Sequence, residues 1–317
     1  MKSDAQLAYE KVQKTLRMAP GMIEECEKRL LFKTAFNCRD LPAVEFGAFF
    51  GASTLALAHG LSEGQSNPHP LICIDAFEVE ADHGFHKHVI NHAKRCQGEH
   101  LLQKTGSKTN WIEITKAVLG DQKKNVRLIK GVVNNNFNMT ILPKRIGLLH
   151  LDLPKDAKTI WPILKGVFPR LTQGSVIAFQ DYAYQFSNEL ISLFELLEQR
   201  EHIKAINIAA SSIFYEVKIN TFSADTLASI LQEAVKNQTK LINDAIHRYK
   251  KYSNSRPKEI IALHAAAICA VIAQTDSSPF ERKKEIRKLI LMMTDIDKQW
   301  GSCYLTELLT EEIERHK

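Results

Sequence analysis

The chain has 317 residues, of which 44% are hydrophobic and 25% are charged, so it is long and apolar enough for a sizeable core. Its formal net charge is +6, but Lys and Arg are dispersed, and nucleic-acid binding is not indicated. The longest apolar run, residues 260–273, is too short to span a bilayer, which argues against a membrane partner. Scattered cysteines without a CxxC pair favour reduced thiols, and we therefore expect a cytoplasmic protein.

Helical and strand-like segments alternate over the first two thirds of the chain. Apolar residues recur at spacings of three and four over 4–37, which predicts helices interrupted near Pro20. Short apolar runs follow, and we expect strands at 43–46, 71–75, 126–130, 146–152 and 175–181, with helices at 85–97, 110–119 and 157–170. Strands that are apolar on both faces and alternate with helices predict an α/β fold with a doubly wound, mostly parallel sheet.

The last third of the chain changes character. The runs 203–209 and 213–219 are close together and predict an antiparallel hairpin at the sheet edge. From Ser223 onward only helical periodicity is found, with helices expected at 223–251, 257–274, 279–297 and 302–315. We therefore predict N-terminal helices over 1–38, an α/β domain over 39–220 and an all-helical C-terminal domain over 221–317. These amphipathic C-terminal helices could form a homo-oligomer interface, a lid or a partner surface.

A glycine-containing turn, "VEFGAFFGAST", follows the first expected strand. Gly47 allows a tight turn and Gly51 allows close approach to the next helix, while Ser53 and Thr54 are placed to cap that helix. Free N–H groups at such a helix start suit a carboxylate or a phosphate. The dinucleotide spacing GxGxxG is absent, because Phe49 occupies the position of its second glycine, and this disfavours an NAD-dependent oxidoreductase.

An acidic residue ends the second expected strand. Asp75 closes "LICID", where a carboxylate can accept hydrogen bonds from the two hydroxyl groups of a ribose. In the alternative interpretation, Gly47 and Gly51 serve only packing and Asp75 only caps the turn that follows it. The acid at this place in this strand favours the ribose interpretation.

These residues together resemble a known family. The pattern ExGxxxGxST followed by a strand-end acid is similar to class I S-adenosylmethionine-dependent methyltransferases, and "PRLTQGSVIAFQDY" resembles the macrocin O-methyltransferase group. The resemblance covers roughly residues 40–200. It implies contacts of the cofactor's methionine part with Glu45, Gly47, Gly51, Ser53 and Thr54, of its ribose with Asp75 and of its adenine with Gly131. It also implies that Asp152 and Asp181 face the methyl acceptor as catalytic residues.

The same resemblance implies a divalent metal, Mg²⁺, held by aspartates at the strand ends, but two expected carboxylates are missing. Pro154 stands at the position of the base, and Gln180 replaces the first of two paired aspartates. Three interpretations stay open. The chain could be a methyltransferase with a reduced metal site of Asp152, Asp181 and Gln180, or a metal-independent methyltransferase. It could also bind S-adenosylmethionine without catalysis and act through its helical domain.

We expect methyl transfer to a small molecule, with a hydroxyl oxygen of a sugar or polyol as the favoured acceptor. A pair of histidines offers a second candidate metal site, since His88 and His92 would share one helical face as zinc ligands do. No cysteine or glutamate completes a metal signature there, so an exposed polar helix is the favoured interpretation.

Overall fold

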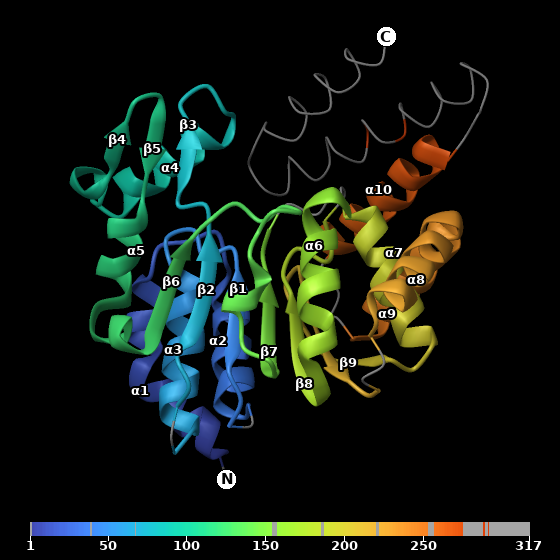
Figure 1. Cartoon of the computed structure of the whole chain (residues 1–317), viewed down its shortest axis with the longest axis horizontal. Coiled ribbons are helices and arrows are strands. Elements are labelled where there is room, and N and C mark those ends of the chain that lie inside the picture. Colours follow the sequence, from blue (N-terminus) through green and yellow to red (C-terminus); the bar gives the residue numbers. More distant parts are fainter. Residues whose placement is uncertain are drawn as a thin grey trace.

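The computed structural model describes residues 2–38, 40–66, 68–153, 157–184, 187–219, 222–252 and 257–274, together with 288 and 291. Seven strands form one sheet in the order β6-β2-β1-β7-β8-β10-β9 (Figure 1). Their bounds are β1 Ala43–Phe46, β2 Leu71–Asp75, β6 Val126–Lys130, β7 Ile146–Leu151, β8 Leu171–Phe179, β9 Ile203–Ala209 and β10 Ser212–Val217. The first five pair in parallel, and β10 is antiparallel to both neighbours. The predicted doubly wound, mostly parallel sheet is therefore confirmed.

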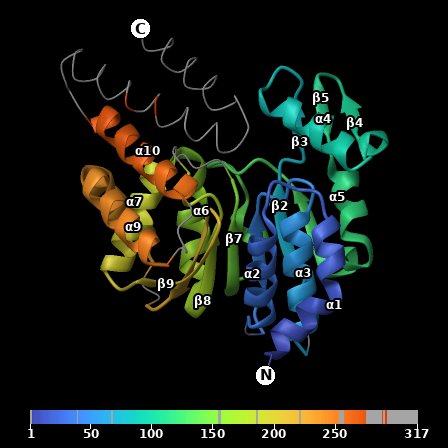
Figure 2. The same ribbon diagram turned by 180° about the vertical axis from the view of Figure 1, so that it is seen from behind.

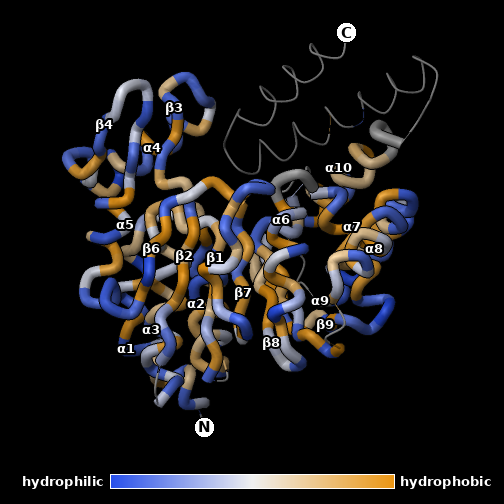
Figure 3. Tube along the Cα trace, viewed as in Figure 1, coloured by the Kyte–Doolittle hydropathy of each residue, from blue (hydrophilic) through white to orange (hydrophobic). Residues whose placement is uncertain are grey.

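Helices cover both faces of this sheet. One face carries α1 (Asp4–Met18), α2 (Glu25–Phe36) and α3 (Ala52–Gly64), which lie in front of the strands in Figure 2. The other face carries α6 (Ala157–Val167) and α7 (Asn188–Gln199). Strands β1, β2 and β7 are buried along their whole length, in keeping with their hydrophobic sequences (Figure 3). A strand covered on both faces reads as a continuous apolar run, which is why these strands could be predicted from sequence.

A small second sheet, formed by the part of the chain that runs from β2 to β6, was not predicted. It consists of β3 (Glu78–Glu80), β4 (Gln103–Thr105) and β5 (Lys108–Asn110) and lies beside α4 (Phe85–Arg95) and α5 (Ile112–Leu119). Its strands are short and largely polar, so they lack the apolar alternation that marks a strand. The carboxylate of Glu78 accepts from Lys108 Nζ at 2.8 Å and from Lys130 Nζ at 2.5 Å. Ion pairs of Glu78 thus connect this sheet to β6.

The histidine pair lies on α4 and gives no metal centre. The Nδ1 atom of His92 lies 2.9 Å from the backbone oxygen of His88. Within the described ranges, no group of three or more His, Cys, Asp or Glu side chains could hold a metal ion. The favoured interpretation of a polar helix agrees with this arrangement.

The C-terminal helices that are described share a core with the sheet. The predicted helix 223–251 is two helices, α8 (Ala224–Lys236) and α9 (Gln238–Tyr252), and α10 spans Pro257–Gln274 as predicted. Leu227 of α8, Ile242 of α9 and Ala266 of α10 belong to the same buried cluster as the residues of β8 and α7. The predicted helices 279–297 and 302–315 lie outside the described residues. A separate C-terminal domain beginning near residue 221 therefore stays a prediction.

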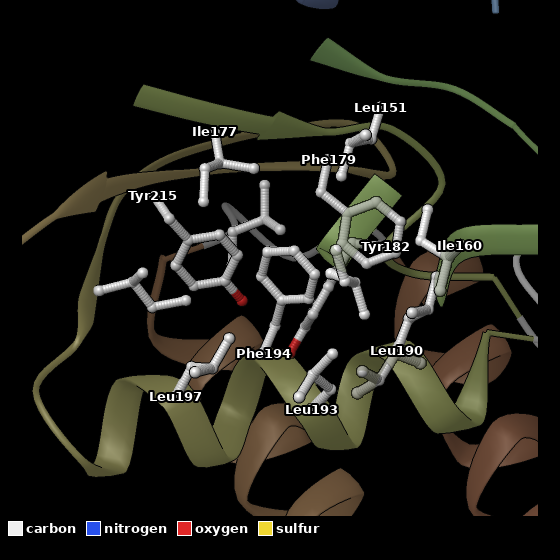
Figure 4. Packing of buried hydrophobic residues seen from close by; sticks show 14 of the residues in the cluster. Leu151, Ile160, Ile177, Phe179, Tyr182, Leu190, Leu193, Phe194, Leu197 and Tyr215 are labelled. Atoms are coloured by element: carbon white, nitrogen blue, oxygen red, sulfur yellow. The ribbon is translucent and has the colours of Figure 1, made fainter. Parts of the chain in front are cut away.

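That cluster is aromatic at its centre (Figure 4). The ring of Phe194 on α7 lies 5.0 Å from that of Phe179 on β8 and 5.2 Å from that of Tyr215 on β10. Tyr182, just after β8, is buried beside them.

None of the described helices is both long and apolar enough to cross a membrane.

A largely buried ion pair connects α9 to α7. The guanidinium of Arg248 donates to both carboxylate oxygens of Glu195, at 2.6 and 3.1 Å, and also lies 2.6 Å from Glu198 Oε1. The side chain of Glu195 is only 1% exposed, so its charge depends on this partner. The ion pair therefore helps to hold the C-terminal helices against the sheet.

We predict that Arg248→Ala lowers the free energy of unfolding by about 3–5 kcal/mol, because the Glu195 charge stays buried without its cation. Urea titration followed by circular dichroism measures this change. Arg200→Ala is the matched control, since Arg200 pairs with Glu233 at the surface and should lose less than about 1 kcal/mol. Equal losses in the two variants would contradict the role given to Arg248.

Candidate functional site

The ends of three central strands meet at the glycine turn between β1 and α3. The amide of Gly47 donates to the carbonyl of Ile74, the last-but-one residue of β2, at 2.9 Å. Gly47 has a φ of +90°, and a Cβ atom there would overlap the backbone carbonyl of Asp152. The amide of Asp152 in turn donates to Phe46 at 2.8 Å, and that of Gln180 donates to Leu151 at 3.0 Å. The structure thus brings together the predicted residues Gly47, Asp152 and Gln180.

Helix α3 begins at this turn without a side-chain cap. Its N-cap residue is Gly51, which has a φ of +91° and lies against Thr115. The predicted capping by Thr54 is wrong, because its hydroxyl donates to Glu45 Oε2 at 2.6 Å and so points beneath the turn. A β-branched residue in the first full turn has its side chain directed along the helix surface, and here a buried carboxylate receives it. Because the N-cap residue Gly51 has no side chain, it gives the first amides of α3 no side-chain cap.

Glu45 lies under the turn and is fully buried. Its second carboxylate oxygen, Oε1, is 3.0 Å from Nδ1 of His150 on β7. Glu45 therefore connects β1, α3 and β7, and both its oxygens have protein partners. The predicted contact with the methionine part of a cofactor stays a prediction, while the contacts favour a role in fixing the turn. The part of His150 in this connection was missed, because a histidine inside an apolar strand has no distinctive sequence signal.

Asp75 holds the same turn from the end of β2. Its Oδ2 accepts from the amides of Ala48 at 2.8 Å and Phe49 at 3.0 Å, and its Oδ1 accepts from Phe77 at 2.6 Å. Burial raises the pKa of Asp75, and these three backbone hydrogen bonds oppose that rise. The structure thus contains the contact of the alternative interpretation, in which Asp75 caps the turn that follows it. A carboxylate offers about four acceptor positions, so about one is left for a ribose hydroxyl, and the ribose contact stays a prediction.

Gly131 lies next to Asp75 at the sheet edge. Its amide donates to the backbone oxygen of Asp75 at 2.9 Å, and the ring of Phe137 approaches its Cα. Gly131 is therefore placed at the end of β6 as expected for a residue near an adenine. The adenine contact itself stays a prediction.

A small cavity of about 20 Å³ lies at the turn. It is lined by Ala48, Phe49, Ala52 and Ser53 of the turn and α3, by Asp152 and Gln180, and by the loop Gly21–Ile23 between α1 and α2. A Cβ on Gly21 would be 2.6 Å from that of Ala52, so this loop lies directly on the start of α3. A cavity of this size holds about one water molecule. A ligand bound at the turn would therefore contact this loop and Phe49.

Gln180 carries an unpaired polar atom in this cavity. Its side chain is 4% exposed, and its Oε1 has no hydrogen-bond partner within the described ranges. Buried acceptors are nearly always paired, so an orphaned one beside a cavity indicates a site for a donor from a ligand. The sequence pattern singled out Gln180 as the replacement of a paired aspartate, but not as an acceptor beside this cavity.

A larger cavity of about 680 Å³ lies elsewhere, between α2, β9 and α9. None of the predicted site residues lines it, and the glycine turn is not part of it. The small cavity is the candidate site, because it lies at the carboxyl edge of the parallel sheet, where α/β proteins bind ligands.

The carboxylate of Asp181 contacts the turn between β9 and β10. Asp181 has a φ of +54°, and its Oδ1 accepts from Ser211 Oγ at 3.1 Å in that turn. Asp152 and Gln180 line the cavity, but Asp181 does not. The contacts of these three residues therefore do not support the predicted Mg²⁺ set. Pro154, which stands at the position of the base, lies outside the described residues.

We predict that Gly47→Ala costs about 1–3 kcal/mol more in unfolding free energy than Gly106→Ala. Both glycines have positive φ, so each variant carries the left-handed backbone cost of about 1–2 kcal/mol. Only a Cβ at Gly47 overlaps the backbone of Asp152, whereas nothing lies within 4 Å of one at Gly106. Thermal and urea unfolding of both variants give the two losses. Equal losses would mean that the turn does not lie against Asp152.

The chain was compared with known proteins. Residues 44–182, less than half of the chain, match the family model described as "Methyltransferase domain". No curated protein matches significantly. The solved O-methyltransferase NovP is 14% identical and matches 66% of this chain and 88% of its own, with a TM-score of 0.46. CalS11, a TDP-rhamnose 3'-O-methyltransferase, is 15% identical over 68% of this chain and 95% of its own, with a TM-score of 0.44.

An O-methyltransferase from Bacillus cereus, solved with SAH, is 13% identical over 69% of this chain and 92% of its own, with a TM-score of 0.39. The family match covers β1, the glycine turn, Asp75, Asp152 and the end of β8. It agrees with the resemblance drawn from ExGxxxGxST, without extending to the macrocin group. The family match thus shows similarity to a methyltransferase domain over residues 44–182.

Proposed function

We propose that the chain transfers a methyl group from S-adenosylmethionine to a hydroxyl oxygen of a small polar molecule, with a sugar or polyol as the acceptor. One observation carries the proposal. The small cavity is bordered both by the start of α3, whose N-cap residue Gly51 has no side chain to cap it, and by Gln180 with its unpaired Oε1. Amides at a helix start attract a carboxylate, and an unpaired buried acceptor attracts an ammonium or another donor. The α-carboxylate and α-ammonium of a bound methionine group have this complementary pattern.

The residues around the cavity have distinct tasks in this proposal. Ala52 and Ser53 offer amides to the cofactor carboxylate, and Gln180 accepts from the ammonium group. Asp75 keeps the turn in place through three amides and offers about one further acceptor position to the ribose. Bound S-adenosylmethionine supplies an electrophilic methyl group on a sulfonium.

Asp152 is the proposed general base. It lies at the end of β7 and lines the cavity, which supports a place for its carboxylate near the acceptor and the methyl group. As the acceptor oxygen bonds to the methyl carbon, Asp152 takes the hydroxyl proton and the electron pair of the C–S bond stays on sulfur. Alignment of the two reactants supplies the remaining rate enhancement. This step needs no metal ligand set, in keeping with the orientation of Asp181.

A hydroxyl-rich acceptor fits the side chains near this edge. Asp152 and Asp181 end neighbouring strands, and Ser211 lies within hydrogen-bond distance of Asp181. Carboxylates and hydroxyls bind vicinal hydroxyl groups through several directed hydrogen bonds, which an apolar acceptor could not match. This is why a sugar or polyol is favoured over an apolar phenol.

We predict that wild-type protein binds S-adenosylmethionine in calorimetry and that Gln180→Met binds it about tenfold more weakly. The variant loses the acceptor for the ammonium group, yet its own stability should be unchanged or higher, since the unpaired buried oxygen is gone. Gln199→Met, on an exposed hydrogen bond to Asp244, is the control and should keep wild-type affinity. Absence of binding to the wild-type protein would contradict the proposed function.

We predict that Asp152→Asn lowers the rate of methyl transfer by about 100-fold or more, while the affinity for S-adenosylmethionine changes little. The measurement is transfer of radiolabelled methyl groups to a panel of sugars and polyols. Asp225→Asn, at the exposed start of α8, is the control. If Asp152→Asn transfers at the wild-type rate to the acceptor found, another residue is the base.

A further inference from the structure

A buried glutamate on α2 has no task in the reaction described so far. Glu27 is 2% exposed, and its Oε1 accepts from Ser212 Oγ at 2.5 Å and from Ser211 Oγ at 3.4 Å. Ser211 Oγ also lies 3.1 Å from Asp181 Oδ1. These contacts form a continuous path from α2, through the turn between β9 and β10, to the acceptor-side aspartate.

The other oxygen of Glu27 leads to the cofactor side. Its Oε2 accepts from the amide of Glu24 at 2.9 Å, as half of a capping box at the start of α2. Glu24 directly follows the loop Gly21–Ile23, which lines the small cavity and lies on the start of α3. One carboxyl group therefore connects the loop over the cofactor cavity with Asp181.

The number of available protons limits which hydrogen bonds Glu27, Ser211 and Asp181 can form at the same time. Ser211 has one hydroxyl proton, so it can donate to Glu27 or to Asp181 but not to both at once. If the Glu27 carboxyl keeps its proton, it can donate to a serine oxygen, and Ser211 is then free to donate to Asp181. Burial raises the pKa of Glu27 to about 7, and its bonds to Ser212 and Glu24 oppose this rise.

The charges around Glu27 act in the same direction. Asp181 and Glu24 raise its pKa further through repulsion. Lys28, its neighbour on α2, directs its ammonium group to the backbone oxygens of Leu16 at 2.9 Å and Ala19 at 2.7 Å. The cation on the next residue is therefore bound elsewhere and does not oppose the rise in the pKa of Glu27.

We propose that Glu27 is a positioning residue that couples the loop over the cofactor cavity to the orientation of Asp181 through Ser211 and Ser212. The loop Gly21–Ile23 lines the cavity, so a cofactor that binds there contacts the loop and can shift it. A shift of the loop reaches Glu24 and Glu27 and, through Ser211, the carboxyl group of Asp181. Cofactor binding thus prepares the acceptor side. This inference rests on the proposed function.

The experiment follows the carboxyl carbon of Asp181 by NMR in protein labelled with ¹³C-aspartate, with S-adenosylhomocysteine as the ligand. The Asp181 signal is assigned by its loss in Asp181→Asn. We expect it to shift on ligand addition in the wild-type protein. Calorimetry of the same samples measures ligand binding separately.

Two variants of Glu27 distinguish coupling from packing. Glu27→Gln keeps an acceptor and a donor in the place of a neutral acid and should retain the ligand-induced shift of Asp181. Glu27→Leu removes both and should reduce the shift at least threefold while the ligand still binds. Ser211→Ala, which keeps Glu27 and its capping box, should reduce the shift as well and serves if the Leu variant does not fold.

Glu25→Leu is the matched control, since Glu25 lies on the same helix and is exposed in its pair with Arg17. It should keep the wild-type shift. Ligand binding with an unchanged Asp181 signal, or a wild-type shift in Glu27→Leu or Ser211→Ala, would overturn the inference alone. No ligand binding to the wild-type protein would contradict the proposed function itself.

Discussion

The absence of a side chain at Gly47 is the constraint on which the site depends. Because Gly47 has no Cβ, the turn after β1 lies against the backbone carbonyl of Asp152, and the ends of β1 and β7 meet. A side chain at this position would separate the cofactor-side turn from the acceptor-side carboxylate. The positive φ of Gly47 and that of Gly51 then direct the chain into α3, whose first amides face the cavity.

Buried polar groups keep this geometry rigid. Asp75 binds three amides, and Glu45 connects Thr54 to His150, so each of these carboxylates has partners on more than one segment. Such fully satisfied networks specify one arrangement of the backbone. The unpaired Oε1 of Gln180 differs from them, and Gln180 borders the small cavity beside the turn.

Much of the fold followed from local pattern. The strands at residues 43–46, 71–75 and 126–130 have the predicted bounds, since parallel strands buried on both faces are continuous apolar runs. The sheet of β3, β4 and β5 was missed because polar ion pairs hold it. The expected helix 223–251 breaks at Asn237, where the chain turns so that α8 and α9 can both pack on α7. Asn237 also ends α8 locally, since its side-chain amide donates to the backbone oxygen of Glu233 at 3.0 Å.

The sequence by itself determined the sheet class, the glycine turn and the strand-end positions of Asp75, Asp152 and Asp181, because these depend on periodicity and on glycine's backbone freedom. Only the tertiary structure decided what those side chains contact. It engaged Asp181 with Ser211 and Asp75 with three amides, left Oε1 of Gln180 unpaired and brought Glu27 from α2 to the turn that contacts Asp181. These outcomes depend on contacts between residues far apart in the chain, and local sequence patterns do not predict such contacts.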